Sequence, residues 1–362
     1  MRLNAVVLLT IIFTASFSSA IAKSKKIDVI AYYTGNDSTL EKYPVEKLTH
    51  VIYSFLHLSG DTIAFANENQ QKTLRGITDL KKKYPKLKVM VSMGGWGGCE
   101  NCSPVFAVVS SRVNFAASVV KVLKEYNADG IDLDWEYPTI EGFPGHPYAA
   151  SDKQNFTELI RELRKQMGQH YELSFAAGGF QSFLTTSVDW KAIMPLINRV
   201  NLMTYDLVNG YSQLTGHHTA LYSRSEQVES TDNCVQYLLK QGLPAKKLVI
   251  GAAFYARVWE NVSDSSNGLY QSGKFLRGVD YKEFDTYLSS DSGWTKYWDD
   301  TAKAPYAYNV PLKQFATYDD EKSLEAKVNY VHKHHLGGIM FWELMNDTFT
   351  NGRLDAIYNA LK

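Results

Sequence analysis

The strongest constraint on the fold is a repeated alternation of short apolar runs with longer amphipathic stretches. Eight runs rich in β-branched or aromatic residues have the length of buried strands, and the stretches between them have helical periodicity. The expected strands cover 27–33, 49–56, 87–93, 130–135, 171–177, 199–204, 248–254 and 338–342. Helices are expected over 70–83, 105–126, 152–167, 226–241 and 321–334. Because the strands are apolar on nearly every residue, both faces of the sheet should be covered.

This order predicts an α/β protein, a (β/α)8 TIM barrel with a small α+β insertion domain after strand 7. An open doubly wound sheet is the alternative, but it would carry a glycine-rich phosphate loop after its first strand, and Tyr32-Tyr33-Thr34-Gly35 is not one. The interval 255–336 is too long for a single crossover without structure of its own. We therefore assign 23–257 and 319–362 to the catalytic barrel and 258–318 to the insertion domain.

The first 22 residues are expected to be a secretory signal peptide. Arg2 provides a positive start, 5–17 is an apolar run, and Ala20-Ile21-Ala22 has the small residues that a signal peptidase reads. The alternative, a membrane anchor helix, needs about 20 apolar residues. The mature chain would begin near Lys23 and be secreted, extracellular or periplasmic, without membrane contact after cleavage.

Net charge bears on the partners of the chain, and its cysteines and histidines bear on disulfides and metal sites. The 38 basic and 38 acidic side chains balance, which disfavours nucleic acid and acidic membranes as partners. In an exported chain, Cys99 and Cys102 are candidates for a local disulfide, and Cys234 for a buried free thiol. A CxxC pair alone is weak evidence for a metal, and the adjacent histidines at 217–218 and 334–335 cannot easily converge on one ion. We expect a monomer with no metal and no cofactor.

Three acidic residues alternate along the fourth expected strand. Asp132, Asp134 and Glu136 would share one face, while Ile131 and Leu133 would face the helices. Successive acids would be about 6.5–7 Å apart and rise toward the carboxyl rim of the barrel, where active sites of this fold lie. Because burying three like charges is costly, at least one should hold a proton near neutral pH and be able to act as a general acid. A solvated edge strand is the alternative, but the purely apolar opposite face argues against it.

The motif Asp-x-x-Asp-x-Asp-x-Glu, from Asp129 to Glu136, resembles the signature of glycoside hydrolase family 18, the chitinase family. That family often carries an α+β insertion at the same place. The chain departs from the family pattern at Ala256, in the loop 207–211 and after strand eight at 343–347, which affects the edges of the cleft. Other matching stretches, in chain order, are Ala31-Tyr32-Tyr33, Tyr53-Ser54-Phe55, Ser92-Met93-Gly94-Gly95-Trp96, Met203-Thr204-Tyr205-Asp206, Phe254-Tyr255-Ala256-Arg257 and Gly337-Gly338-Ile339-Met340-Phe341-Trp342.

The resemblance implies a retaining, substrate-assisted glycosidase, in which the acetamido oxygen of the sugar attacks its own anomeric carbon. Glu136 would be the general acid and base, Asp134 would orient the acetamido N–H, Asp132 would hold Asp134, and Tyr205 would bind the acetamido group from the opposite wall. Spacing alone leaves Asp134 open as an ordinary nucleophile. Asp129 and Gly130 complete the motif as structural positions.

The resemblance also implies a substrate cleft lined by aromatic residues, which suits a chain with 13% aromatics. Trp342 would be the floor under the reacting sugar, unless it only packs in the core. Arg257 has an alternative as an ion-pair partner, and Met203 as a core residue. The remaining wall positions are Tyr32, Phe55, Trp96, Tyr137, Asp206 and Tyr255.

The expected function is that of a secreted chitinase, a hydrolase that cleaves β-1,4 bonds between N-acetylglucosamine units of chitin or its oligosaccharides. An endo-β-N-acetylglucosaminidase acting on N-glycans would share the acid motif. A chitin-binding lectin on the same fold is the third possibility, but such relatives typically lack the terminal acid, and Glu136 is present.

Overall fold

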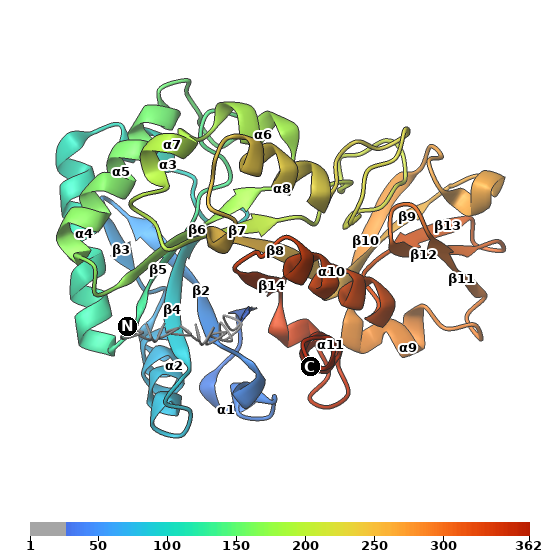
Figure 1. Ribbon diagram of the computed structural model, residues 1–362, viewed down its shortest axis with the longest axis horizontal. Helices are drawn as coiled ribbons and strands as arrows, with labels where there is room; N and C mark the ends of the chain where they lie inside the picture. Colours follow the sequence, from blue (N-terminus) through green and yellow to red (C-terminus); the bar gives the residue numbers. More distant parts are fainter. Residues whose placement is uncertain (1–26) are drawn as a thin grey trace, which may run out of the picture.

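The computed structural model describes residues 27–362, so the expected signal peptide at 1–22 lies outside the described residues. Eight parallel strands form a barrel surrounded by helices, and a second, smaller sheet lies beside it (Figure 1). The first strand pairs with both the second and the last, which closes the barrel and confirms the predicted fold. The barrel strands are β1 (Asp28–Tyr33), β2 (His50–Ser59), β4 (Lys88–Gly94), β5 (Gly130–Asp134), β6 (Glu172–Gly178), β7 (Arg199–Met203), β8 (Leu248–Ala253) and β14 (Gly338–Trp342). A short β3 (Thr62–Ala64) pairs antiparallel with the end of β2.

The long helices pack around the barrel, and several begin at a capping side chain. Ser230 accepts a hydrogen bond from the Asn233 amide, so α8 begins at Thr231 rather than at the predicted 226. The predicted helix 105–126 is divided in two because Val108 has an extended backbone. No helix within 27–362 has the length and apolar character needed to cross a membrane. The helices are α1 (Asp37–Leu40), α2 (Glu68–Asp79), α3 (Cys102–Phe106), α4 (Val109–Tyr126), α5 (Asp152–Met167), α6 (Gln181–Thr186), α7 (Trp190–Ile193), α8 (Thr231–Lys240), α10 (Glu321–Lys333) and α11 (Arg353–Ala360).

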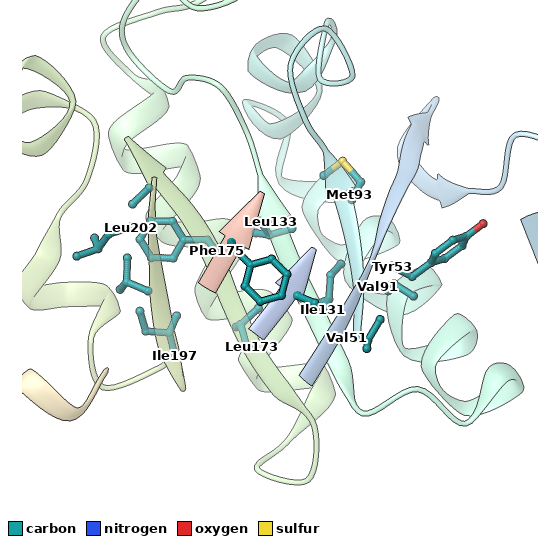
Figure 2. Close-up of a cluster of buried hydrophobic side chains, with 14 of the residues drawn as sticks. Val51, Tyr53, Val91, Met93, Ile131, Leu133, Leu173, Phe175, Ile197 and Leu202 are labelled. Carbon is teal, nitrogen blue, oxygen red and sulfur yellow. The ribbon is translucent and has the colours of Figure 1, made fainter. Parts of the chain in front are cut away.

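Alternation along the barrel strands separates two apolar layers. Ile131 and Leu133 of β5 lie in the outer layer between sheet and helices, together with Val91, Phe175 and Leu202 (Figure 2). The inner layer fills the barrel, and its members include Ile30, Ile52, Met90, Val249 and Met340. The barrel is therefore a packed core, and polar side chains that point inward must find partners there.

An ion cluster closes the amino-terminal end of the barrel. Glu172 accepts from Lys88 and Arg199, each at 2.7 Å, and lies 3.2 Å from a ring nitrogen of His50. All four residues begin their strands. These ionic contacts lie at the amino-terminal end, whereas active sites of this fold lie at the opposite, carboxyl end.

The insertion follows the seventh barrel strand, β8, as predicted. Its antiparallel sheet has the order β10-β9-β13-β12-β11, and the short helix α9 (Phe284–Tyr287) packs on it. Buried aromatic rings, among them Trp259, Trp294, Tyr308 and Phe315, form its two small cores. The loop after β7 forms an isolated antiparallel bridge, Leu214 with Ser272, to the segment just before β10. The strands are β9 (Tyr255–Glu260), β10 (Lys274–Asp280), β11 (Trp294–Asp299), β12 (Ala304–Asn309) and β13 (Gln314–Thr317).

Candidate active site

Asp132 lies completely buried inside the barrel and accepts four hydrogen bonds. The donors are Ser174 Oγ at 2.6 Å, Tyr32 Oη at 2.8 Å, Asn201 Nδ2 at 2.9 Å and Ser92 Oγ at 3.3 Å. They come from β6, β1, β7 and β4, so the closed barrel is needed to bring them together. Burial raises the pKa of Asp132 to about 6, and these hydrogen bonds oppose a larger rise.

Asp134 lies one step nearer the rim and has a different environment. It is 4% exposed, and its Oδ1 atom has no hydrogen-bond partner. Burial, and then the charges of Glu136 and Asp132, raise its pKa well above the usual range. The buried, unpaired oxygen leaves Asp134 able to accept a hydrogen bond from a bound ligand.

Glu136 follows β5 and is the outermost acid of the column. Burial, and then the charge of Asp206, raise its pKa to about 7, against a hydrogen bond from Tyr137 that favours the charged form. The Tyr137 ring packs edge-on against Phe180 and Phe183. A carboxyl group that titrates near neutral pH at the rim of a barrel is suited to donate and accept a proton in turn.

The residues after β7 form the opposite wall. Asp206 accepts from Tyr255 Oη at 2.8 Å, from Arg257 Nη2 at 2.5 Å and from Arg257 Nε. Burial alone would raise the pKa of Asp206, but the Arg257 guanidinium and the His218 ring hold it below its usual range. Arg257 is therefore ion-paired, the alternative considered above. Tyr205 is buried, and its hydroxyl has only the weak acceptor Met340 Sδ, at 3.8 Å.

Aromatic rings gather at the end of β14. The Trp342 ring stacks on Phe55 with centroids 5.4 Å apart and planes at 17°, and lies 5.9 Å from the Tyr32 ring. Trp342 and Phe55 are partly exposed, whereas Tyr32 is 1% exposed and uses its hydroxyl to support Asp132. Tyr32 is thus buried in the barrel interior, and Met203 likewise packs there.

A second group of aromatic rings lies on the loops at the rim. Trp96 is 48% exposed, and its ring is 5.6 Å from Phe143 and 6.3 Å from Tyr211. Sequence reasoning included Trp96 but missed the other two, which belong to the loops after β5 and β7. A signal for Tyr211 and Phe143 was present, because both are large aromatic residues in glycine-containing loops.

Asp129 and Gly130 lie at the opposite end of β5 from the acids. Asp129 Oδ2 accepts from the Val89 amide at 2.7 Å and from Lys81 Nζ at 3.1 Å. A Cβ atom on Gly130 would lie 2.1 Å from the Glu172 carbonyl oxygen. Both positions shape the strand and do not contact the site.

The cysteines form one disulfide and one free thiol, and the adjacent His217 and His218 point apart. Cys99 and Cys102 are joined in a disulfide, and Cys234 is buried and free. The adjacent rings of His217 and His218 diverge, the first toward Asp299 and the second toward Asp206. Within 27–362, no three His, Cys, Asp or Glu side chains are grouped as metal ligands.

Three of the four donors around Asp132 were not among the residues predicted from the sequence. Ser92, Ser174 and Asn201 are polar residues inside otherwise apolar strands. Such a residue must point at a polar partner when both faces of the strand are buried. That signal was available, but the sequence does not say which partner each one meets.

Comparisons with known proteins agree with this geometry. Residues 28–347 match the family model described as glycosyl hydrolases family 18. The chain is 33% identical over 326 residues to chitinase A1 of Niallia circulans, covering 82% of this chain and 46% of that protein. It is 28% identical over 415 residues to chitinase B of Serratia marcescens, covering 91% and 81%. It is also 31% identical over 316 residues to an oviduct-specific glycoprotein of Mus musculus, covering 83% and 43%. The chain thus spans less than half the length of the first and third of these relatives.

Solved structures show the same architecture. A glycoside hydrolase family 18 N-acetylglucosaminidase from Paenibacillus barengoltzii superposes with a TM-score of 0.84 at 35% identity, covering 92% of this chain and all of that one. The Ostrinia furnacalis group IV chitinase in complex with allosamidin has a TM-score of 0.84 at 27% identity, with 93% and 98% covered. Because the family model spans most of the chain and the barrel carries the acid column at its rim, this chain belongs to glycosyl hydrolase family 18.

Proposed function

We propose that this protein is a chitinase that hydrolyses β-1,4 bonds between N-acetylglucosamine units with retention of configuration. The observation that carries the proposal is the acid column of β5. Glu136 titrates near neutral pH at the rim, and its charge acts on a buried Asp134 whose Oδ1 has no partner. A sugar acetamido N–H is a donor that would satisfy this oxygen.

The proposed mechanism assigns each group one task. Glu136 protonates the glycosidic oxygen, and the acetamido oxygen of the same sugar attacks the anomeric carbon, giving an oxazolinium intermediate. Asp134 accepts the acetamido N–H and stabilises the positive charge, while the Tyr205 hydroxyl donates to the acetamido oxygen. Glu136 then removes a proton from the water that opens the intermediate, which restores the acid.

The substrate contacts of the proposal follow from the aromatic rings. The partly exposed face of Trp342 supports the reacting sugar, and Trp96 offers a further stacking surface at the rim. Asp206, paired with Arg257, holds the opposite wall in place. We also propose that the chain is secreted through the segment 1–22 and acts as a monomer, with no nucleic-acid or membrane partner.

The test is to incubate the mature protein with N-acetylglucosamine oligomers and, in parallel, with a high-mannose glycopeptide. Products are read by mass spectrometry with anomer-resolved detection. Shorter oligomers that appear first as the β-anomer are the expected result. Cleavage of the glycopeptide alone would replace the proposal with N-glycan release.

The variant Glu136→Gln separates catalysis from binding. It keeps the size and one hydrogen-bond acceptor of the side chain but has no acidic proton to donate. Turnover should fall by about 10²–10⁴-fold, the usual contribution of a general acid. Binding of oligomers should persist. Unchanged turnover would refute the assignment, and a wild type that binds oligomers without cleaving them would identify a lectin.

A further inference from the structure

His218 is a buried histidine that the mechanism above does not use. It belongs to the loop after β7, and its side chain is completely buried. Its carbonyl oxygen accepts from the Leu207 amide at 3.0 Å, and its own amide donates to Thr317 Oγ1 of β13 at 3.1 Å. Both sides of the backbone are held, so the main chain of His218 is fixed between the start of its own loop and the insertion sheet.

The ring lies against the wall formed by Asp206. Nδ1 is 3.5 Å from Asp206 Oδ1, and the ring centroid is 5.2 Å from that of Tyr255. Neither ring nitrogen has a hydrogen-bond partner at normal distance. Buried polar atoms are seldom unpaired, and a distance a few tenths of an ångström too long is common in catalytic hydrogen bonds before substrate binds.

Burial and the charges around the ring together determine its protonation state. The carboxylates of Asp206 and Asp319 face it, but each already has a cationic partner, Arg257 for the first and Lys327 for the second. Tyr255 is the other titratable neighbour. Burial lowers the pKa of His218, in spite of the opposing effect of Asp206. At neutral pH the ring is therefore uncharged and carries one N–H.

We infer that His218 is a positioning residue for the reaction proposed above, on which this inference rests: its Nδ1–H donates to Asp206 and holds that carboxylate against Tyr255 and Arg257. The Nδ1 tautomer places the single N–H opposite the carboxylate and leaves Nε2 as an unpaired acceptor. Protonation adds a second buried N–H, which has no partner, and a second cation beside Arg257. When the ring gains a proton at acid pH, the contacts among Asp206, Tyr255 and Arg257 should therefore be disrupted, and activity should fall.

Two substitutions separate the donor from the proton equilibrium. His218→Asn keeps an N–H donor but cannot titrate, whereas His218→Leu removes the donor. His217→Asn is the matched control, because His217 is the adjacent buried histidine and faces Asp299 instead of Asp206. The value of kcat/KM on N-acetylglucosamine oligomers is measured for wild type and the three variants, from neutral pH down through the acid side of the pH profile.

We expect kcat/KM of His218→Asn to stay within about threefold of wild type at neutral pH. Below about pH 6.5, where histidine gains a proton, this variant should keep more of its activity than wild type does. At neutral pH, His218→Leu should lose about ten- to hundred-fold relative to wild type, the effect of removing a hydrogen bond to a charged group. The difference should narrow at acid pH, where the wild-type ring is itself protonated. The pH profile of His217→Asn should have the same shape as that of wild type. Identical acid limbs for wild type and His218→Asn would overturn the inference, as would an equal change in the control.

A measurement without substrate distinguishes this inference from the proposed function. The ring of His218 is titrated by NMR in wild type and in Asp206→Asn. Its signal is assigned by comparison with His218→Asn, in which it is absent. Removing a carboxylate this close should lower the pKa of the ring by about one unit or more. An unchanged pKa would overturn the inference, whereas absent hydrolysis with a shifted pKa would overturn only the proposed function.

Discussion

Replacing Lys327 with methionine should remove about 3–5 kcal/mol from the free energy of unfolding. Lys327 Nζ lies 2.6 Å from Asp319 Oδ2, and neither side chain has any exposed surface. The same carboxylate accepts from the Ala253 amide at the end of β8 and from Thr219 Oγ1. Removing one partner of a buried ion pair leaves the other charge uncompensated, which costs about that amount.

The expected shift in the unfolding midpoint follows from the size of the chain. Globular proteins gain about 2.1 cal/mol/K of unfolding entropy per residue, which gives about 0.7 kcal/mol/K for the described part of the chain. The midpoint should therefore fall by about 4–7 °C in a thermal scan followed by circular dichroism.

Two further variants make this prediction specific. Lys333→Met changes an exposed lysine of the same helix and should cost less than about 0.5 kcal/mol. Adding Asp319→Asn to Lys327→Met removes the uncompensated charge and should move the midpoint back toward wild type. A Lys327→Met midpoint that matches the Lys333→Met control would refute the reasoning, as would a double variant no more stable than the single one.

Three other predictions concern the site and the strand that carries it. Turnover should decline as the pH rises through about 7, because burial and then the charge of Asp206 set the pKa of Glu136 there and only the protonated group can donate; a constant rate up to about pH 9 would contradict this. Trp342→Ala should raise KM for oligomers by about ten- to thirty-fold through loss of the stacking surface, and an unchanged KM would place the ring outside the cleft. Gly130→Ala should destabilise the protein by about 1–3 kcal/mol, because the new Cβ would meet the Glu172 carbonyl oxygen, and an unchanged denaturation curve would show that the strand can shift.

Local backbone geometry explains why the sequence alone located the acid column. Side chains alternate along any strand, so Asp132 and Asp134 had to share a face opposite Ile131 and Leu133, whatever the rest of the fold. Order along the chain likewise places Asp129 before the strand and Glu136 after its end. The repeated pattern of strands and helices was equally local, and it predicted the barrel and the place of the insertion.

The partners of these residues were not predictable in the same way. Asp132 meets donors from four strands, and Asp206 in the loop after β7 meets Arg257, which lies 51 residues later in the insertion sheet. Hydrogen bonds between residues so distant in sequence depend on the register of the closed barrel and on how the insertion returns to it.

What the sequence determined by itself is therefore which side chains point into the barrel and in what order they rise toward the rim, because a strand of period two leaves no other choice. Only the tertiary structure decided their chemistry. It leaves Asp134 Oδ1 unpaired, pairs Arg257 with Asp206, buries Tyr32 inside the barrel and places His218 beside Asp206. Protonation and pairing depend on burial and on neighbouring charges, and both arise from contacts between segments that are far apart along the chain.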